Sequence, residues 1–306
     1  MEQSAEGGEP KRGVRVRLPA AGEAQLGGYA YVPERAGPGA PLLVAVHGIS
    51  RDGREQARAF EASAETHGWV LVAPEFDETR HGDYQRLGRV DRGPRADRAL
   101  ENLVDACAKR FDLRFGPRFL FGFSAGGQFV HRYLMAHPER VTAAVVGAPG
   151  WYTFPDPKRA YPHGLRVGRE LPGVRMVPTG FLRIPVLVAV GSRDFQRDRS
   201  LRQTARVDRQ QGQDRLERAV RWVEAMNRLA LRHELPPPVQ LRVIKGVGHD
   251  FGENSVAGLV DLTESFFTRK PGESVDSGAE FREESDGGPI DRPKHEDDGP
   301  ASPRGE

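Results

Sequence analysis

The sequence contains almost no cysteine and no long apolar run. Its single cysteine, Cys107, excludes a disulfide bond within the 306-residue chain. Cys107 falls in a helical pattern over residues 96–110, which favours a packed thiol over a nucleophile. No apolar run approaches the roughly 20 residues that a membrane-spanning helix requires, so we expect no membrane partner. Residues 1–13 are polar and lack the apolar segment of a secretion signal, which predicts a cytoplasmic protein and leaves open a leader removed before Met1.

Charge is small overall but unevenly distributed. The formal net charge is +2, yet residues 271–306 hold eleven acidic side chains against four lysines and arginines. This stretch has too few large apolar residues to offset the entropy lost on ordering. We therefore expect a flexible N-terminus over residues 1–13, a folded domain over 14–268 and a disordered acidic tail over 269–306. The arginines that crowd residues 193–232 alternate with acidic residues, as on a solvated surface, so we expect no nucleic-acid partner.

Apolar runs alternate with helical patterns between the two termini. The predicted strands are residues 15–18, 28–32, 41–46, 69–73, 119–123, 143–146, 185–190 and 239–244. The predicted helices are residues 55–67, 96–110, 125–136, 214–235 and 256–267. Most strands are continuous apolar runs rich in β-branched residues, as expected of strands buried on both faces. The sequence therefore predicts the α/β class, with a mostly parallel central sheet, helices on both faces and an antiparallel pair at the opening edge.

The helix expected at residues 214–235 illustrates how burial is inferred from spacing. Leu216, Val220, Val223 and Leu229 recur on it near helical spacing. We expect these four side chains to face the core and the arginines of this region to face solvent.

The segment Gly122-Phe123-Ser124-Ala125-Gly126 joins a predicted strand to a predicted helix. A G-x-S-x-G sequence in that setting is typical of a nucleophile elbow, a tight turn that exposes a serine hydroxyl at the top of a sheet. Glycines two residues either side of the serine leave the room that strand and helix need to approach each other. Ser124 is therefore the predicted nucleophile. The alternative is a glycine-rich loop in which Ser124 only caps the next helix.

A serine hydroxyl needs a base, and the base needs a partner that fixes its tautomer. His249 follows the last predicted strand in a Gly-Val-Gly-His-Asp loop whose glycines let it fold back over the sheet. Asp194 follows the strand at 185–190, and the carboxyl ends of parallel strands meet at one edge of a sheet. The sequence therefore predicts a triad of Ser124, Asp194 and His249, in that chain order. Asp198, four residues further on, is the alternative to Asp194.

The tetrahedral intermediate of acyl transfer needs two hydrogen-bond donors for its oxyanion. One predicted donor is the backbone N–H of Ala125, at the start of the helix after the nucleophile. The other is the N–H of Ile49, in the His-Gly-Ile-Ser turn after the strand at 41–46, with the N–H of Ser50 as the alternative. His47 is expected to support this turn by hydrogen bonding rather than to act as a base.

These motifs and their order resemble the α/β-hydrolase fold superfamily over roughly residues 14–268. The resemblance rests on the His-Gly turn, the Gly-Phe-Ser-Ala-Gly elbow, the Gly-Ser-Arg-Asp loop that carries Asp194 and the Gly-His-Asp loop that carries His249. The turn and the elbow are similar to those of polyhydroxybutyrate-depolymerase-like, feruloyl-esterase-like, dienelactone-hydrolase-like and prolyl-oligopeptidase-like proteins. The resemblance implies a serine hydrolase that cleaves a carboxylic ester through an acyl-enzyme.

Residues 151–182 interrupt the alternation at the place where this superfamily often carries a cap, after the strand that follows the nucleophile helix. The segment is rich in aromatic residues, and we expect Trp151 and Tyr152 to line the substrate pocket. The alternative is that they only pack the insert onto the body. The implied chemistry takes a small-molecule ester and needs no metal or organic cofactor. A peptidase or amidase with the same triad, or a non-catalytic binding protein of the same fold, are the alternative functions.

Overall fold

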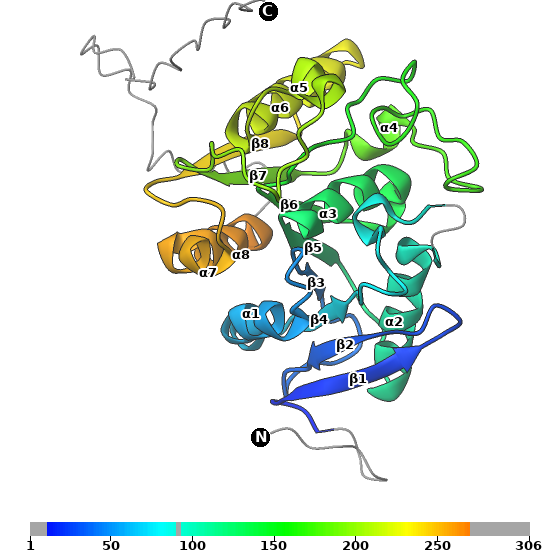
Figure 1. Cartoon of the computed structure of the whole chain (residues 1–306). Helices are drawn as coiled ribbons and strands as arrows, with labels where there is room; N and C mark the ends of the chain where they lie inside the picture. Colours follow the sequence, from blue (N-terminus) through cyan, green and yellow to red (C-terminus); the bar gives the residue numbers. More distant parts are fainter. Residues whose placement is uncertain (1–10, 90–92, 270–306) are drawn as a thin grey trace, which may run out of the picture. The chain divides into compact units, whose positions relative to one another are not determined.

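The computed structural model describes residues 11–89 and 93–269, which form an α/β fold around one eight-stranded sheet (Figure 1). The expectations of a flexible N-terminus and of a disordered acidic tail fall almost entirely outside these residues. Within them, no helix combines the length and the apolar character needed to span a bilayer.

The sheet is mixed but mostly parallel. Its strands are β1 (Arg15–Ala21), β2 (Leu26–Tyr31), β3 (Leu42–Val46), β4 (Val70–Glu75), β5 (Arg118–Phe123), β6 (Ala143–Gly147), β7 (Val186–Gly191) and β8 (Val239–Ile244). They lie in the order β1-β2-β4-β3-β5-β6-β7-β8. β2 pairs antiparallel with both β1 and β4, whereas the pairs from β4 through β8 are parallel. The predicted sheet, with an antiparallel pair at its first edge, is confirmed.

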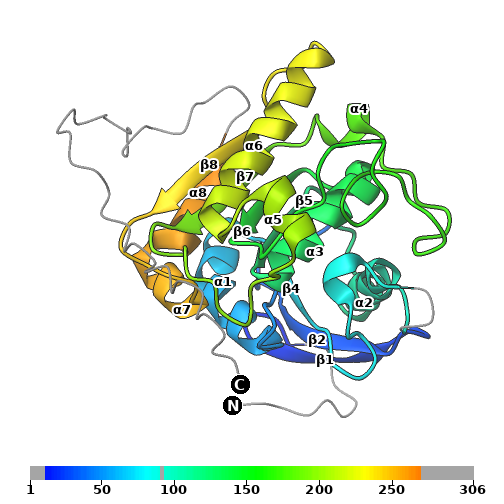
Figure 2. The same ribbon diagram turned by 45° about the horizontal axis from the view of Figure 1, so that its top comes forward.

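Helices cover both faces of the sheet (Figures 1 and 2). The α-helices are α1 (Gly53–His67), α2 (Ala96–Arg110), α3 (Ala125–Ala136), α4 (Pro178–Phe181), α5 (Ala205–Gln211), α6 (Arg215–Arg232), α7 (Phe251–Asn254) and α8 (Val260–Thr268). The shorter turns are η1 (Tyr84–Arg86), η2 (Pro138–Arg140) and the π-turn η3 (Ser255–Leu259). On one face, Glu264 of α8 bonds Ser63 and His67 of α1. On the other, the rings of Trp222 in α6 and His131 in α3 lie 5.7 Å apart.

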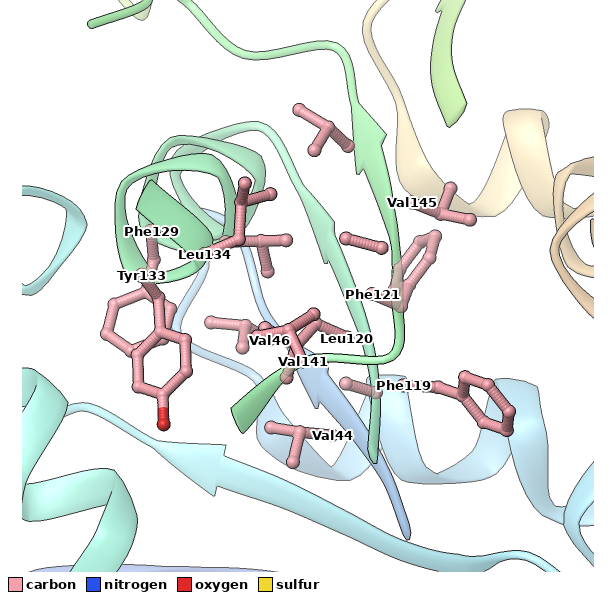
Figure 3. Close-up of a cluster of buried hydrophobic side chains, with 14 of the residues drawn as sticks. Val44, Val46, Phe119, Leu120, Phe121, Phe129, Tyr133, Leu134, Val141 and Val145 are labelled. Carbon is pink, nitrogen blue, oxygen red and sulfur yellow. The ribbon is translucent and has the colours of Figure 1, made fainter. Parts of the chain in front are cut away.

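The core fills the space between the strands and the helices, and α3 contributes much of it (Figure 3). Strands β3, β6 and β7 are buried at every residue, because helices cover both of their faces. Helix α3 is also buried along its whole length, and Phe129 and Leu134 on it belong to the same buried cluster as Val46 and Leu120 of the strands. The cysteine on α2 is likewise packed in the core, and burial raises the pKa of the Cys107 thiol to about 12. Its expected role as a packed thiol is thus confirmed.

Helix α6 buries a different face from the predicted one. Of the four apolar residues expected to face the core, Leu229 is buried, Leu216 and Val223 are half-buried against the core, and Val220 is 37% exposed. The buried face is made instead by Arg215, Arg218, Ala219, Trp222, Met226, Leu229 and Ala230. The expectation that the arginines of this region face solvent is therefore wrong for two of them, because their guanidinium groups bond loops inside the protein.

The C-terminal helical region is broken rather than continuous. The expected helix at residues 256–267 begins earlier, at Phe251, and passes through the π-turn η3 before it continues as α8. Gly258 interrupts it with φ of 101°, a left-handed conformation that glycine adopts without strain. Helix α5 was not predicted, because its sequence Ala-Arg-Val-Asp-Arg-Gln-Gln carries no apolar period.

Helix α3 approaches the sheet closely where it leaves β5. A Cβ atom on Gly126 would lie 2.6 Å from the carbonyl oxygen of His47, and nearer still to that of Val46. A Cβ atom on Gly127 would lie 2.7 Å from the carbonyl oxygen of Gly147 on β6. Real Cβ atoms essentially never lie within 3.0 Å of another atom. These two positions therefore require glycine so that two backbones can meet.

We expect Gly126→Ala to destabilise the fold by about 3 kcal/mol or more, because the added methyl group can be accommodated only by moving α3 away from β3. Urea unfolding at constant pH measures this. Gly37→Ala is the matched control, since nothing lies within 4 Å of a Cβ there, and it should unfold at the wild-type urea concentration. A Gly126→Ala protein as stable as the control would show that the close approach does not constrain the fold.

Candidate active site

Ser124 sits at the sharp turn between β5 and α3. Its backbone has φ of 56° and ψ of −114°, a conformation that costs a non-glycine residue about 1–3 kcal/mol. Two backbone hydrogen bonds hold it there: its N–H donates to the carbonyl of Gly147 at 2.7 Å, and its carbonyl accepts from the N–H of Gln128 at 3.0 Å. The predicted strand, elbow and helix are therefore present, and the strain falls on the predicted nucleophile.

The structure brings Ser124, His249 and Asp194 together. His249 Nε2 lies 2.9 Å from Ser124 Oγ, and His249 Nδ1 lies 2.7 Å from Asp194 Oδ2. A carboxylate can only accept a hydrogen bond, so the proton of the neutral imidazole belongs on Nδ1. Nε2 is then left to accept the proton of the serine hydroxyl, which is the arrangement that general-base activation of a serine requires.

The loops that carry Asp194 and His249 are bonded directly to each other. The Arg193 N–H donates to the carbonyl of Val247 at 2.9 Å, and the Gly246 N–H donates to Ser192 Oγ at 2.9 Å. The ring of Phe123, next to the serine, stacks on the imidazole of His249 at 5.2 Å. Asp194 and His249 are thus held at a fixed spacing by the bonded loops that follow β7 and β8.

Asp194, rather than Asp198, meets the histidine. Asp194 is 1% exposed, and its second oxygen accepts a 3.1 Å hydrogen bond from the fully buried Arg215. Asp198 is 44% exposed, lies 3.5 Å from the same guanidinium and accepts the N–H and hydroxyl of Ser200. Arg215 therefore holds Asp194 Oδ1, while Asp194 Oδ2 faces His249. No local pattern signals this role, because Arg215 lies 21 residues from the aspartate and among many other arginines.

The turn expected to carry an oxyanion donor lies against the nucleophile. A Cβ on Gly48 would lie 3.5 Å from the Ser124 Cβ. Ile49, which is 61% exposed, lines a small pocket beside Ser124 and His249. Ala125 is the first residue of α3, where a backbone N–H has no acceptor within the helix. Ser50 lines the pocket as well, so both alternatives for the second donor stay open.

His47 supports this turn, as expected. Its Nε2 accepts the N–H of Phe76 at 2.9 Å, so Nδ1 carries the proton and donates to the Gly48 carbonyl at 2.7 Å. The hydroxyl of Tyr84 also bonds the carbonyls of His47 and Gly48. Burial lowers the pKa of His47 to about 4, so the ring is neutral near pH 7.

A small pocket of about 200 Å³ opens beside the serine and the histidine. It is lined by Gly48, Ile49, Ser50, Glu55, Gln56, Phe123, Ser124, His249, Asp250 and Phe251. Trp151 and Tyr152, expected to line the substrate pocket, are packed elsewhere. The Tyr152 ring is fully buried and stacks on Trp222 at 4.9 Å, while Trp151 lies beneath arginine side chains. The alternative, that the two rings pack the insert onto the body, describes them better.

Among the described residues, no group of three or more histidine, cysteine or acidic side chains is arranged to hold a metal ion.

Comparison with known proteins gives the class of this fold. The structure superposes on a poly(3-hydroxybutyrate) depolymerase from Bordetella parapertussis with a TM-score of 0.67 and 26% identity, covering 86% of this chain and 92% of that one. It superposes on poly(aspartic acid) hydrolase-1 from Sphingomonas sp. KT-1 with a TM-score of 0.65 and 23% identity, covering 79% of this chain and 99% of that one. The chain therefore has the α/β-hydrolase fold and is similar to hydrolases of that fold.

Comparison of sequences finds a more distant relative that is also an esterase by its name. A stretch of 117 residues is 25% identical to part of a bifunctional acetylxylan esterase/xylanase from Neocallimastix patriciarum. The match covers 38% of this chain but only 16% of that protein. No family model matches the chain. Structural and distant sequence similarity thus indicate a serine hydrolase without naming its substrate.

We expect Asp194→Asn to lower turnover of an activated ester by about 10²–10⁴-fold, because an amide in that position favours the wrong tautomer of His249. Asp198→Asn is the control: its carboxylate is exposed and does not touch the imidazole, so turnover should stay near the wild-type value. Steady-state kinetics on both purified variants decide the assignment. A loss in Asp198→Asn with none in Asp194→Asn would reverse it.

The neutral state of His47 predicts how stability depends on pH. The pKa of the imidazole is about 4 in the folded protein and 6.5 ordinarily, so the unfolded chain binds more protons between these two values. The contribution of His47 to the free energy of unfolding should therefore be full above about pH 6.5 and fall by about 3 kcal/mol as the pH drops to 4. Urea unfolding at several pH values measures the loss.

His47→Gln should remove this part of the pH dependence, whereas His233→Gln, at an exposed position, should retain it. An unchanged pH dependence in a folded His47→Gln protein would assign the effect to another buried imidazole. His131 is the next to test, because burial lowers its pKa well below the ordinary value.

Proposed function

We propose that this protein is a carboxylic ester hydrolase in which Ser124 is the nucleophile, His249 the general base and Asp194 the residue that orients the base. The observation that carries the proposal is the continuous chain of contacts from Ser124 Oγ through the imidazole to Asp194 Oδ2, at 2.9 and 2.7 Å. The poly(3-hydroxybutyrate) depolymerase among the structural relatives and the acetylxylan esterase/xylanase in the sequence comparison support an ester substrate.

In the first half of the reaction, Ser124 Oγ attacks the ester carbonyl carbon while His249 Nε2 takes the hydroxyl proton. In this scheme, the N–H groups of Ala125 and of Ile49 or Ser50 stabilise the negative charge on the carbonyl oxygen. The carbon–oxygen bond to the alcohol then breaks, and the alcohol leaves with the proton from His249. The acyl group stays bound to the serine.

In the second half, a water molecule gives a proton to His249 Nε2 and attacks the acyl carbon. The acid is released, and the proton returns to Ser124. Asp194 stabilises the imidazolium that forms in each half, and the hydrogen bond from Arg215 holds its carboxylate in the plane that faces Nδ1. Arg215 is a positioning residue in this scheme, since it touches neither the substrate nor the reacting atoms.

We expect Ser124→Ala to abolish hydrolysis of para-nitrophenyl esters, apart from residual catalysis by the oxyanion donors, and to abolish labelling by a fluorophosphonate probe. The probe reports an activated serine directly and does not depend on guessing the substrate. Ser265→Ala, at an exposed serine on α8, is the control and should label and turn over as the wild type does. Near wild-type turnover in a folded Ser124→Ala protein would contradict the proposal, and absence of labelling in the wild type would favour a non-catalytic binding protein.

A further inference from the structure

Three arginines from three separate segments gather around one tryptophan. The guanidinium carbon of Arg132 lies 4.3 Å from the centre of the Trp151 ring, that of Arg202 lies at 5.0 Å and that of Arg86 at 5.5 Å. The imidazole of His163 lies 5.1 Å from the same ring. Three positive charges therefore share one small volume.

These charges are poorly compensated in the part of the chain that the structure describes. Arg132 is fully buried, yet it donates only to the neutral groups of Thr153, Gln85 and Gln128, and its Nη2 has no hydrogen-bond partner. The buried Nε atoms of Arg86 and Arg202 have none either. Asp83 lies 3.9 Å from Arg86, but it lies closer, at 3.3 Å, to Arg89.

The free energy of such a cluster is unfavourable without an anion. Guanidinium groups stacked on an indole gain about 0.5–2 kcal/mol each, but this attraction does not neutralise their charge. A buried cation without a paired anion costs several kcal/mol. The crowding of positive charge also shifts the pKa values of Arg132 and His163. Burial and the charges of Arg86 and Arg202 lower the pKa of Arg132 to about 9. Burial and the charges of Arg206, Arg202, Arg132 and Arg86 lower the pKa of His163 to about 4.

Arg86, Trp151 and Arg202 lie on segments that follow the carboxyl ends of β4, β6 and β7, and Arg132 lies on α3, which follows Ser124. Trp151 is four residues beyond Gly147, whose carbonyl bonds the N–H of Ser124. Arg132 lies eight residues after Ser124 on α3, a rise of about 12 Å, and long helical side chains lean back toward the helix start. Arg86, Arg202 and His163 keep part of their surface exposed, so an anion can approach the cluster from solvent. The unpartnered nitrogens themselves are buried, and an anion reaches them only when these side chains move.

We propose that Arg86, Arg132 and Arg202 form a subsite for a carboxylate carried by the ester substrate. The inference rests on the proposed role of Ser124 and narrows its substrate class to esters that carry a free acid group. Arginine suits this task because its planar fork of donors matches the two oxygens of a carboxylate. The unpartnered nitrogens of the three side chains are the donors that the carboxylate would occupy.

The kinetic test compares para-nitrophenyl hemiesters of dicarboxylic acids with neutral para-nitrophenyl esters of the same carbon number. We expect the wild type to favour the hemiesters in kcat/KM, and Arg202→Gln to lower that preference about tenfold through the lost charged hydrogen bond. Arg209→Gln, an exposed arginine on α5 outside the cluster, should keep the preference. Equal kcat/KM for both ester series in the wild type would overturn the substrate assignment.

The binding test needs no hydrolysis and uses proteins that carry Ser124→Ala. Glutarate or inorganic phosphate, compared with chloride at equal ionic strength, should raise Tm in Ser124→Ala and in its Arg209→Gln combination but not in its Arg202→Gln combination. No rise in any of the three would overturn the anion site itself. A rise without any hemiester preference would show that the site takes a free anion instead, which also overturns the carboxylate-substrate proposal. Failure of the anion site and failure of the esterase proposal are thus distinguished.

Discussion

The active-site geometry depends on how closely the start of α3 can lie against the end of β3. Gly126 has no side chain, so its backbone rests directly on the carbonyls of Val46 and His47. This contact brings the turn after β3 to within van der Waals distance of Ser124, where a backbone donor can reach an oxyanion. The same contact forces Ser124 into its strained conformation, and the packing of a fully buried helix offsets that strain.

Much of the fold and the central contacts were predictable because they follow from local patterns. Continuous apolar runs give buried parallel strands, and a glycine two residues either side of Ser124 leaves few alternatives to an elbow. Asp194 and His249 could be assigned from sequence because each directly follows a strand, and parallel strands bring their carboxyl ends together. The predicted contacts among Ser124, His249 and Asp194 agree with the structure.

The parts that could not be predicted depend on tertiary contacts of polar residues. Arg215 and Arg218 lie on α6 at positions that a hydrophobic count assigns to solvent, but they reach Asp194 and the loops around Gly150 and Gly212. Because the helix face that carries these two arginines is buried, Val220 is exposed to solvent. Trp151 was likewise predicted to line the pocket, from its place in an aromatic-rich insert. No local pattern reveals that arginines from three segments cover its ring. Burial of arginine is decided by distant partners, which a single sequence does not display.

The distance along the chain between the reacting groups has a consequence for biosynthesis. Ser124 and the imidazole that contacts it are 125 residues apart, and His249 follows β8, which pairs with β7 at the edge of the sheet. A nascent chain that has emerged only as far as β7 contains the whole elbow but no histidine to take the serine proton. Hydrolysis as proposed here must therefore wait until β8 has docked, so the growing polypeptide has no activated serine before that point.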